Sequence, residues 1–199
     1  MKVLVLASYA PSLINFRGQL IADMVAAGHE VVASAPGVEP RVAEALARRG
    51  ASYLPAPIAR TGLNPVLDAA SIARLAALLR RLAPDLLFAY THKPVIYGSM
   101  AARLARVPRV FPMITGLGYA FTEGRQLRRR ALREITTRLY RASLRKVAGV
   151  FFQNPDDMAE FRRLASSPSA TSWSASTARA STLSTSRPRR RRSRGRCSC

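Results

Sequence analysis

The chain has 199 residues, with 32 Lys and Arg against 11 Asp and Glu, and a formal net charge of +21 at pH 7. This length is enough for one well-packed α/β domain. No apolar run reaches the roughly 20 residues that would cross a bilayer, and the N-terminal MKVLVLASYAPS lacks the pattern of a secretory signal, so we interpret it as a first strand. Both cysteines, Cys197 and Cys199, lie at the extreme C-terminus. The rest of the chain therefore cannot form disulfides, which fits a reducing compartment, and we expect no metal site.

Short apolar runs alternate with segments of helical period up to about Leu164, which is typical of a parallel sheet with crossover helices. The expected strands are 2–7, 31–35, 51–54, 86–90, 110–114 and 150–153, and the expected helices are 16–27, 41–49, 65–82, 95–104, 127–146 and 156–164. The pattern predicts a single open, Rossmann-like α/β domain over residues 1–164. In such a fold, ligands bind beyond the carboxyl ends of the strands.

Residues 165–199 have a different composition. They contain eight arginines, no Lys, Asp or Glu, and are otherwise mostly Ser, Ala and Thr. Such a segment cannot bury enough apolar surface to offset its ordering entropy, so we expect a disordered tail. Without those eight arginines the domain still carries a net charge of +13, and it is strongly basic by itself.

Two interpretations of the tail remain open. An Arg/Ser segment is typical of an arm that neutralises nucleic-acid phosphates. Alternatively, the segment is an ordinary coding region in a shifted frame, because its codons read one base over give GLVPQRHELVRVNGSGVDLVDF, which resembles a loop and a strand. The coherence of that string favours the shifted frame, and therefore a truncated chain. The coding DNA beyond Leu164 would decide between the two.

The loop after the first strand is the first candidate binding site. Asn15, Phe16, Arg17 and Gly18 place a positive side chain and helix N-terminal amides at the carboxyl edge of the sheet, which suits an anion. The loop lacks the GxGxxG fingerprint, which disfavours a nicotinamide cofactor. A solvated Arg17 in the first helical turn is the alternative.

A second candidate site follows the strand at 86–90. Thr91, His92 and Lys93 come directly after it, and Pro94 opens the next helix. Imidazole titrates near neutrality, so His92 suits proton transfer or phosphate contact, and both His92 and Lys93 are catalytic candidates. The alternative is a structural loop pair. His29, in a turn between a helix and a strand, is interpreted as structural.

A glycine-rich loop follows the strand at 110–114. In TGLGY, Gly116 and Gly118 permit backbone shapes closed to other residues, and Thr115 and Tyr119 offer hydroxyl groups. We therefore expect these four residues to contribute to binding, although a plain turn would use the same residue types.

The blocks SLINFRG, AGHEV, YTHKPVIYGSMAARLARVPRVFPMITGLGYAFT and FFQNPDD resemble the N-terminal half of bacterial GT-B glycosyltransferases. The resemblance covers residues 1–164. It is closest to retaining enzymes that use GDP- or UDP-sugars to extend polyprenyl-diphosphate-linked sugars in capsule and O-antigen assembly. Many relatives place a His where this chain has Thr115 and Gly116, so the resemblance leaves the catalytic residue unknown.

The resemblance implies a division of labour between two halves. The N-terminal half presents the acceptor, whereas the C-terminal half binds the nucleotide-sugar donor, so no separate cofactor is implied. We therefore predict transfer of a hexose or acetamido-hexose to a polyprenyl-diphosphate-linked saccharide by the parent enzyme, and an inactive isolated chain.

The helix expected at 127–146 is strongly basic. Its arginines include Arg128, Arg129, Arg133, Arg141 and Arg145, around an expected apolar stripe of Leu132, Ile135, Leu139 and Ala142. A basic amphipathic helix is typical of a surface that faces anionic lipid. With a lipid-linked acceptor, this predicts a cytoplasmic protein held peripherally at the inner face of the plasma membrane. A helix docked on its own domain with a solvated basic face is the alternative.

Two other functions stay open. A basic nucleic-acid-binding protein with an Arg/Ser arm should interleave its cations with exposed aromatics, yet the basic helix has only Tyr140 and the tail only Trp173, so nucleic acid is the less favoured partner. An oxidoreductase or epimerase of Rossmann type is disfavoured by the missing glycine fingerprint.

Overall fold

The described strands form one parallel sheet, as the unbroken apolar runs predicted. The computed structural model describes residues 1–58, 65–116, 127–165 and 175–177. The strands follow the spatial order β3-β2-β1-β4-β5-β6-β7. They are β1 (Lys2–Leu6), β2 (Glu30–Ala35), β3 (Ser52–Pro55), β4 (Leu86–Tyr90), β5 (Arg109–Ile114), β6 (Val150–Phe152) and β7 (Ala175–Thr177). This confirms the Rossmann-like fold class.

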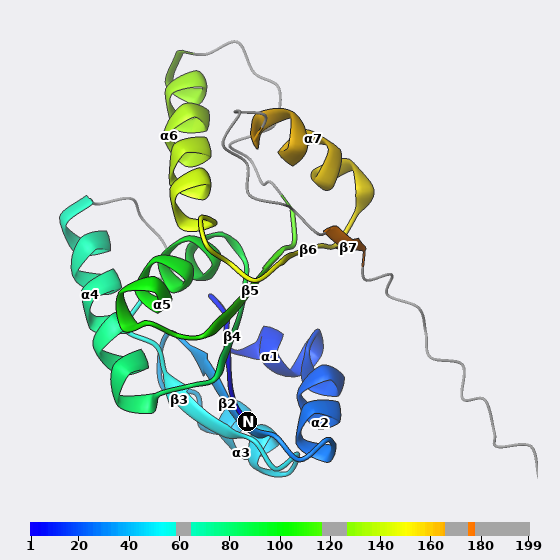
Figure 1. Ribbon diagram of the computed structural model, residues 1–199. Helices are drawn as coiled ribbons and strands as arrows, with labels where there is room; N and C mark the ends of the chain where they lie inside the picture. The colour runs from blue at the N-terminus through cyan, green and yellow to red at the C-terminus, as the bar shows by residue number, and fades with distance from the viewer. Residues whose placement is uncertain (59–64, 117–126, 166–174, 178–199) are drawn as a thin grey trace, which may run out of the picture.

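Helices cover both faces of the sheet (Figure 1). One face packs against α1 (Pro11–Asn15), α2 (Gly18–Ala26) and α3 (Pro40–Ala47). The other packs against α4 (Pro65–Leu82), the π-helical segment η1 (Pro94–Gly98), α5 (Ser99–Ala105), α6 (Leu127–Ser143) and α7 (Pro155–Ala165). The result is the three-layer arrangement expected of alternating strands and helices.

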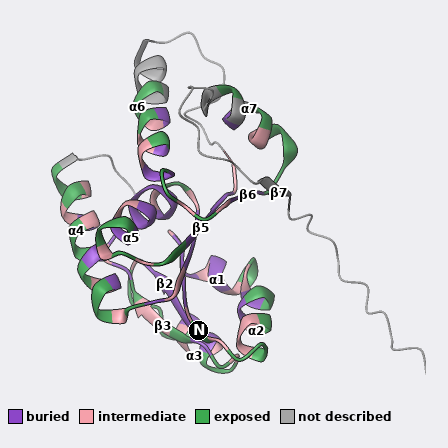
Figure 2. Cartoon of the chain, in the orientation of Figure 1, coloured by how far each residue is buried: buried purple, intermediate pink, exposed green. Residues whose placement is uncertain are grey.

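The central strands are buried on both sides, and the purple strands of Figure 2 lie between helices whose outer surfaces are green. Successive side chains of β1 alternate between the two faces. Val3 and Val5 belong to the core under α1–α3, whereas Leu4 and Leu6 belong to the core under α4–α7. This double burial explains why the strand reads as continuous aliphatic sequence.

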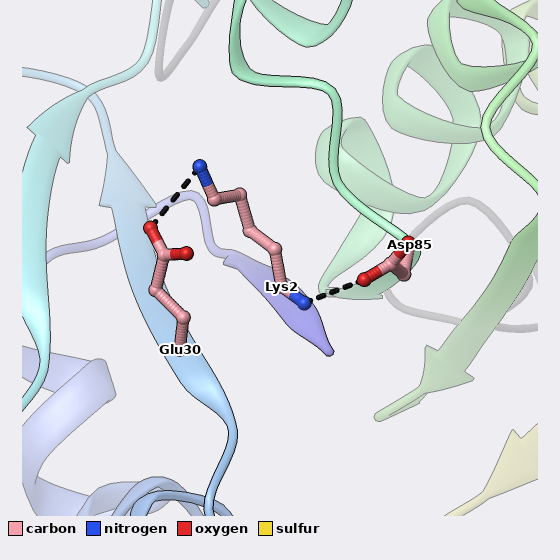
Figure 3. Close-up of polar contacts among 3 residues, drawn as sticks. All are labelled: Lys2, Glu30 and Asp85. Atoms are coloured by element: carbon pink, nitrogen blue, oxygen red, sulfur yellow. Dashed lines mark hydrogen bonds and ion pairs between the residues drawn. The ribbon is translucent and has the colours of Figure 1, made fainter.

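A polar clamp fixes the amino end of the central strands (Figure 3). Asp85 accepts a hydrogen bond from the backbone N–H of Lys2 at 2.7 Å, and its own N–H donates to the Lys2 carbonyl at 2.9 Å. The Lys2 ammonium lies 3.1 Å from Glu30. The clamp joins β1 to both neighbouring strands at the edge opposite the candidate site.

Gly98 allows the helix after β4 to lie close to the sheet. A Cβ atom at this position would lie 2.9 Å from Leu6 Cδ2 and 3.5 Å from Ala89 Cβ. A larger residue would therefore push the helix away from β1 and β4, and with it the residues at the start of the helix.

Two elements differ from the sequence-based expectation. The single helix expected at 16–27 is preceded by a separate short helix, α1, with Pro11 in its first turn and Leu13 in the core. The second is β7, which pairs parallel to β6 in a region where no sequence pattern predicted a strand. The remaining residues of the tail lie outside the described part of the chain, so their disorder stays a prediction.

Candidate functional site

The candidate site lies at the carboxyl edge of the sheet, where the strand order reverses between β1 and β4. In open α/β sheets the loops on either side of this reversal diverge and leave room for a ligand. A side-chain hydrogen bond joins the loops after β1 and β4, from Thr91 Oγ1 to Ser8 Oγ at 2.8 Å. The bond ties Thr91, the first residue after β4, to the loop after β1.

Thr91 has an uncommon backbone conformation. Its φ is positive and lies in the left-handed region, which a β-branched side chain rarely adopts. Its carbonyl accepts the N–H of Val95, so it immediately precedes the helical segment that begins at His92. Such strain persists where the surrounding contacts hold it, and it is concentrated at functional sites.

Arg17 extends across the ends of β4 and β5. Its guanidinium lies 5.1 Å from the ring centroid of Tyr90, one terminal nitrogen lies 3.2 Å from Met113 Sδ, and the other donates to the Phe16 carbonyl at 2.9 Å. The Nε atom is buried without a hydrogen-bond partner among the described residues. Burial lowers the pKa of Arg17, although the neighbouring Tyr90 opposes the shift.

Among the described residues no carboxylate pairs with Arg17. A half-buried guanidinium that lacks such a counter-ion is costly to desolvate, and an anion is its natural complement. Of the four residues predicted in this loop, Arg17 is the one that reaches over the strand ends. Asn15 and Phe16 are exposed, and Gly18 is the buried first residue of α2.

Ser12 and Tyr90 fix the floor beneath Arg17, and the sequence did not single out either residue. Ser12 Oγ donates to the Tyr9 carbonyl at 2.6 Å and lies 2.8 Å from the Tyr90 hydroxyl. The Tyr90 hydroxyl therefore donates to Ser12. Burial raises the pKa of Tyr90, so its ring presents a neutral face to Arg17. The sequence signal that could have identified Tyr90 as a site residue is its position at the end of β4.

Lys93 is held in an ion pair. Its Nζ lies 3.5 Å from Asp68 of α4, and both side chains are largely removed from water, with 14% and 15% exposed. The ammonium also lies 5.7 Å from the Tyr97 ring centroid, and burial together with Asp68 raises the pKa of Tyr97. The structure thus holds Lys93, one of the two catalytic candidates predicted from the sequence, against α4.

His92 lies at the same strand end and contacts α6. Its Nδ1 is 2.7 Å from the hydroxyl oxygen of Tyr140. The residue as a whole is exposed, but the contact with the protein desolvates the ring and lowers the pKa of His92, while the charge of Asp157 opposes this shift. The structure therefore brings Thr91, His92 and Arg17 to one edge.

The glycine-rich loop is described in part. Thr115 and Gly116 follow β5 at the carboxyl edge, and Gly116 has a positive φ, which favours glycine. Gly118 and Tyr119 lie outside the described residues, so their predicted role stays a prediction.

The apolar stripe predicted for the basic helix is exposed in part. Ile135 is 56% exposed, whereas Tyr140 and Leu144 are buried, because the helix packs through Tyr140 against His92 and α7. Arg141 and Arg145 are exposed. Arg128, Arg129 and Arg133 fall within α6, but their side chains lie outside the described part of the chain.

The described residues contain neither a cluster of metal ligands nor a membrane-spanning helix. No three His, Cys, Asp or Glu side chains there gather as a metal site would require. No described helix combines the length and the apolar character needed to cross a membrane.

Comparison with known proteins gives a family match. A family model described as "Glycosyl transferase 4-like domain" matches residues 15–171. The chain is 26% identical over 163 residues to the N,N'-diacetylbacillosaminyl-diphospho-undecaprenol alpha-1,3-N-acetylgalactosaminyltransferase of Campylobacter jejuni subsp. jejuni serotype O:2. The match covers 82% of this chain and 42% of that relative, so the chain spans less than half the relative's length.

Solved structures give the same fold at low identity. MurG of Acinetobacter baumannii has a TM-score of 0.53 at 16% identity, covering 88% of this chain and 44% of MurG. The UDP-GlcNAc 2-epimerase of Neisseria meningitidis bound to UDP-GlcNAc has a TM-score of 0.54 at 16% identity, with 82% and 43% coverage. Alr3699/HepE of Anabaena in complex with UDP and glucose has a TM-score of 0.55 at 12% identity, with 82% and 41% coverage. At these identities the likeness shows the fold alone, and an epimerase shares it.

Proposed function

Because the chain belongs to the glycosyl transferase 4-like domain family, with the fold of the N-terminal half of a GT-B glycosyltransferase, we propose that it is the acceptor-binding half of such an enzyme. The family match favours transferase over epimerase chemistry, which the fold does not separate. In the proposed reaction a hexose or acetamido-hexose passes from a nucleotide sugar to a polyprenyl-diphosphate-linked saccharide. The name of the Campylobacter relative, which includes a diphospho-undecaprenol sugar, supports this acceptor class.

The observation that carries the proposal is the guanidinium of Arg17 at the carboxyl edge, which no carboxylate of the described residues neutralises. A lipid-linked saccharide has a diphosphate between its lipid and its sugar, and guanidinium groups bind phosphate oxygens with charge-assisted hydrogen bonds. The contact of Arg17 with Tyr90 and the nearby strained Thr91 put this cation where the strand order reverses. The Arg17 side chain would hold the diphosphate and leave the sugar beyond the edge.

Binding of farnesyl diphosphate, compared with farnesol, tests this role. Arg17→Gln should weaken diphosphate binding at least tenfold, because a charged hydrogen bond contributes about 1.5–3 kcal/mol. Arg48→Gln is the matched control, since Arg48 pairs with Glu44 on the exposed surface beside α3. Equal affinity for farnesol and farnesyl diphosphate, or an unaffected Arg17→Gln variant, would refute the proposal.

The proposal extends to location. We place the protein at the cytoplasmic face of the plasma membrane, with the basic helix α6 against anionic lipid. Exposed Ile135 and the exposed cations Arg141 and Arg145 support such a contact, because interfacial helices combine apolar and cationic side chains. Capsule or lipopolysaccharide assembly is the process that this acceptor class suggests.

A further inference from the structure

His92 and Tyr140 are joined across two elements that are far apart in sequence. His92 Nδ1 lies 2.7 Å from the Tyr140 hydroxyl oxygen, and the two rings meet edge to face at 71°. One residue follows the end of β4, and the other lies on the inner side of α6. A contact this short fixes the orientation of the imidazole at the carboxyl edge.

Tyr140 is rigidly held and buried. It is 2% exposed, its ring meets Phe161 of α7 at 90° with centroids 5.7 Å apart, and Phe161 in turn packs on Phe152. Its hydroxyl has no hydrogen-bond partner other than His92 among the described residues. Burial and the charge of Asp157 both raise the pKa of Tyr140, so the hydroxyl keeps its proton.

We infer that the Tyr140 hydroxyl donates a hydrogen bond to Nδ1 of His92. This bond selects the neutral tautomer with hydrogen on Nε2 and makes His92 a hydrogen-bond donor to a phosphate oxygen. The opposite tautomer would place Nδ1–H against the hydroxyl oxygen and leave the hydroxyl hydrogen unpaired in an apolar core, which is costly. Tyr140 is thus a positioning residue. The phosphate part of the inference rests on the proposed function.

Burial, and not the charges around the pair, favours the neutral ring. Asp157 in the first turn of α7 is the acidic group that acts on both residues, and Asn154 accepts its backbone N–H at 2.7 Å. The ammonium of Lys93 beside His92 is paired with Asp68 instead. Burial against α6 outweighs Asp157 and lowers the pKa of His92. A ring that already carries hydrogen on Nε2 cannot take a proton there, so this geometry selects hydrogen bonding over general-base catalysis.

The groups at the carboxyl end of β4 favour a phosphate over a neutral ligand. Arg17 lies over Tyr90, the last residue of β4, and His92 follows Tyr90 by two residues, so both side chains belong to the same strand end. A helical segment begins at His92, at this edge, and a helix N-terminus favours negative charge. Two donors and a helix N-terminus at one strand end suit a diphosphate.

Nitrogen-15 NMR of the full chain tests the tautomer directly. The chain has two histidines, so His29→Gln assigns the His92 resonances. Near neutral pH we expect a protonated Nε2 and an unprotonated Nδ1 in the wild type, and loss of this preference in Tyr140→Phe. A dominant Nδ1–H tautomer of His92 while Tyr140 is intact overturns the inference.

Titration of the same sample tests the ligand. Inorganic pyrophosphate should shift the Nε2–H resonance, and UDP and farnesyl diphosphate separate a nucleotide source from a lipid source. An Nε2 resonance unmoved by all three overturns the phosphate assignment. If the tautomer is found and UDP alone shifts it, the inference stands and the acceptor-side function fails. If farnesyl diphosphate binds while His92 carries Nδ1–H, the function stands and the inference fails.

Discussion

Lys93 was a catalytic candidate because of its residue type, but its contacts in the structure indicate a structural role. Its ammonium is paired with Asp68 and largely removed from water. We expect Lys93→Met to lower the free energy of unfolding by about 2 kcal/mol, less than the roughly 3–5 for a fully buried pair, because both side chains keep some exposure. Urea denaturation measures this loss.

The exposed pair of Arg48 and Glu44 provides the control for Lys93. Arg48→Met should change the free energy of unfolding by less than about 0.5 kcal/mol, as is usual for surface ion pairs. Adding Asp68→Leu to Lys93→Met should recover part of the loss, because the uncompensated carboxylate is removed. A loss for Lys93→Met no larger than for Arg48→Met would contradict the structural role.

His92 should make stability depend on pH in a predictable direction. Its pKa is lower in the folded chain than the usual value of about 6.5 for an exposed histidine. The unfolded chain therefore binds more protons between those two values, and stability should fall as the pH drops below about 6.5. His92→Gln should flatten that part of the curve. A wild-type curve that rises on acidification through this range would contradict the sign.

The sequence predicted the candidate edge residues better than their partners. Arg17 follows the first strand and His92 the fourth, and both strands could be located from their aliphatic runs. Tyr140 and Asp68 instead lie on α6 and α4, which come after and before the His92 loop along the chain. Their contacts depend on helix rotation and packing, which residue types alone do not specify.

At the level of elements, the end of α5 is strained by its C-cap. Arg106 adopts a left-handed conformation there, with both φ and ψ positive, and glycine adopts this conformation at lower cost. Arg106→Gly should stabilise the chain by about 0.5–1 kcal/mol. The measurement is the urea midpoint at constant slope.

Arg103 in the same helix is the control for Arg106. Its guanidinium donates to the Ala142 carbonyl at the end of α6. Arg103→Gly should destabilise the chain by at least about 1 kcal/mol, since it places glycine inside a helix and also removes that hydrogen bond. Stabilisation by both glycines, or by neither, would contradict this account of the α5 terminus.

Periodicity predicted the long elements and failed where helices change direction or rotate. The bounds of α4 and β4 match the predicted ranges 65–82 and 86–90. The short helix α1 was missed because residues 11–15 were interpreted as part of a loop, and α2 begins at Gly18 rather than at residue 16. The sequence left the rotation of α6 open, because tertiary contacts of Tyr140, rather than the aliphatic stripe, decide it.

For the whole molecule, the basic helix predicts salt-sensitive binding to anionic vesicles. Each Lys or Arg near such a surface contributes about 1 kcal/mol, screened over roughly 8 Å at physiological salt. Reversing the charge of Arg129, Arg133 and Arg141 should abolish co-sedimentation with phosphatidylglycerol vesicles.

A second triple variant controls for net charge. Reversing Arg41, Arg48 and Arg49, which lie in and just after α3, changes the net charge equally and should leave much of the vesicle binding. Equal losses in the two triple variants would assign the attraction to net charge rather than to α6.

The central claim is that this half holds the lipid-linked acceptor and leaves the donor to the other half of the enzyme. Calorimetric titration of the wild-type chain with an undecaprenyl-diphosphate-linked saccharide in detergent, and separately with UDP- and GDP-sugars, measures both affinities on one sample. The account predicts saturable binding of the lipid-linked saccharide, at least tenfold weaker binding of the nucleotide sugars, and no sugar transfer when both are present. Tighter binding of a nucleotide sugar, or transfer by the chain alone, would contradict it.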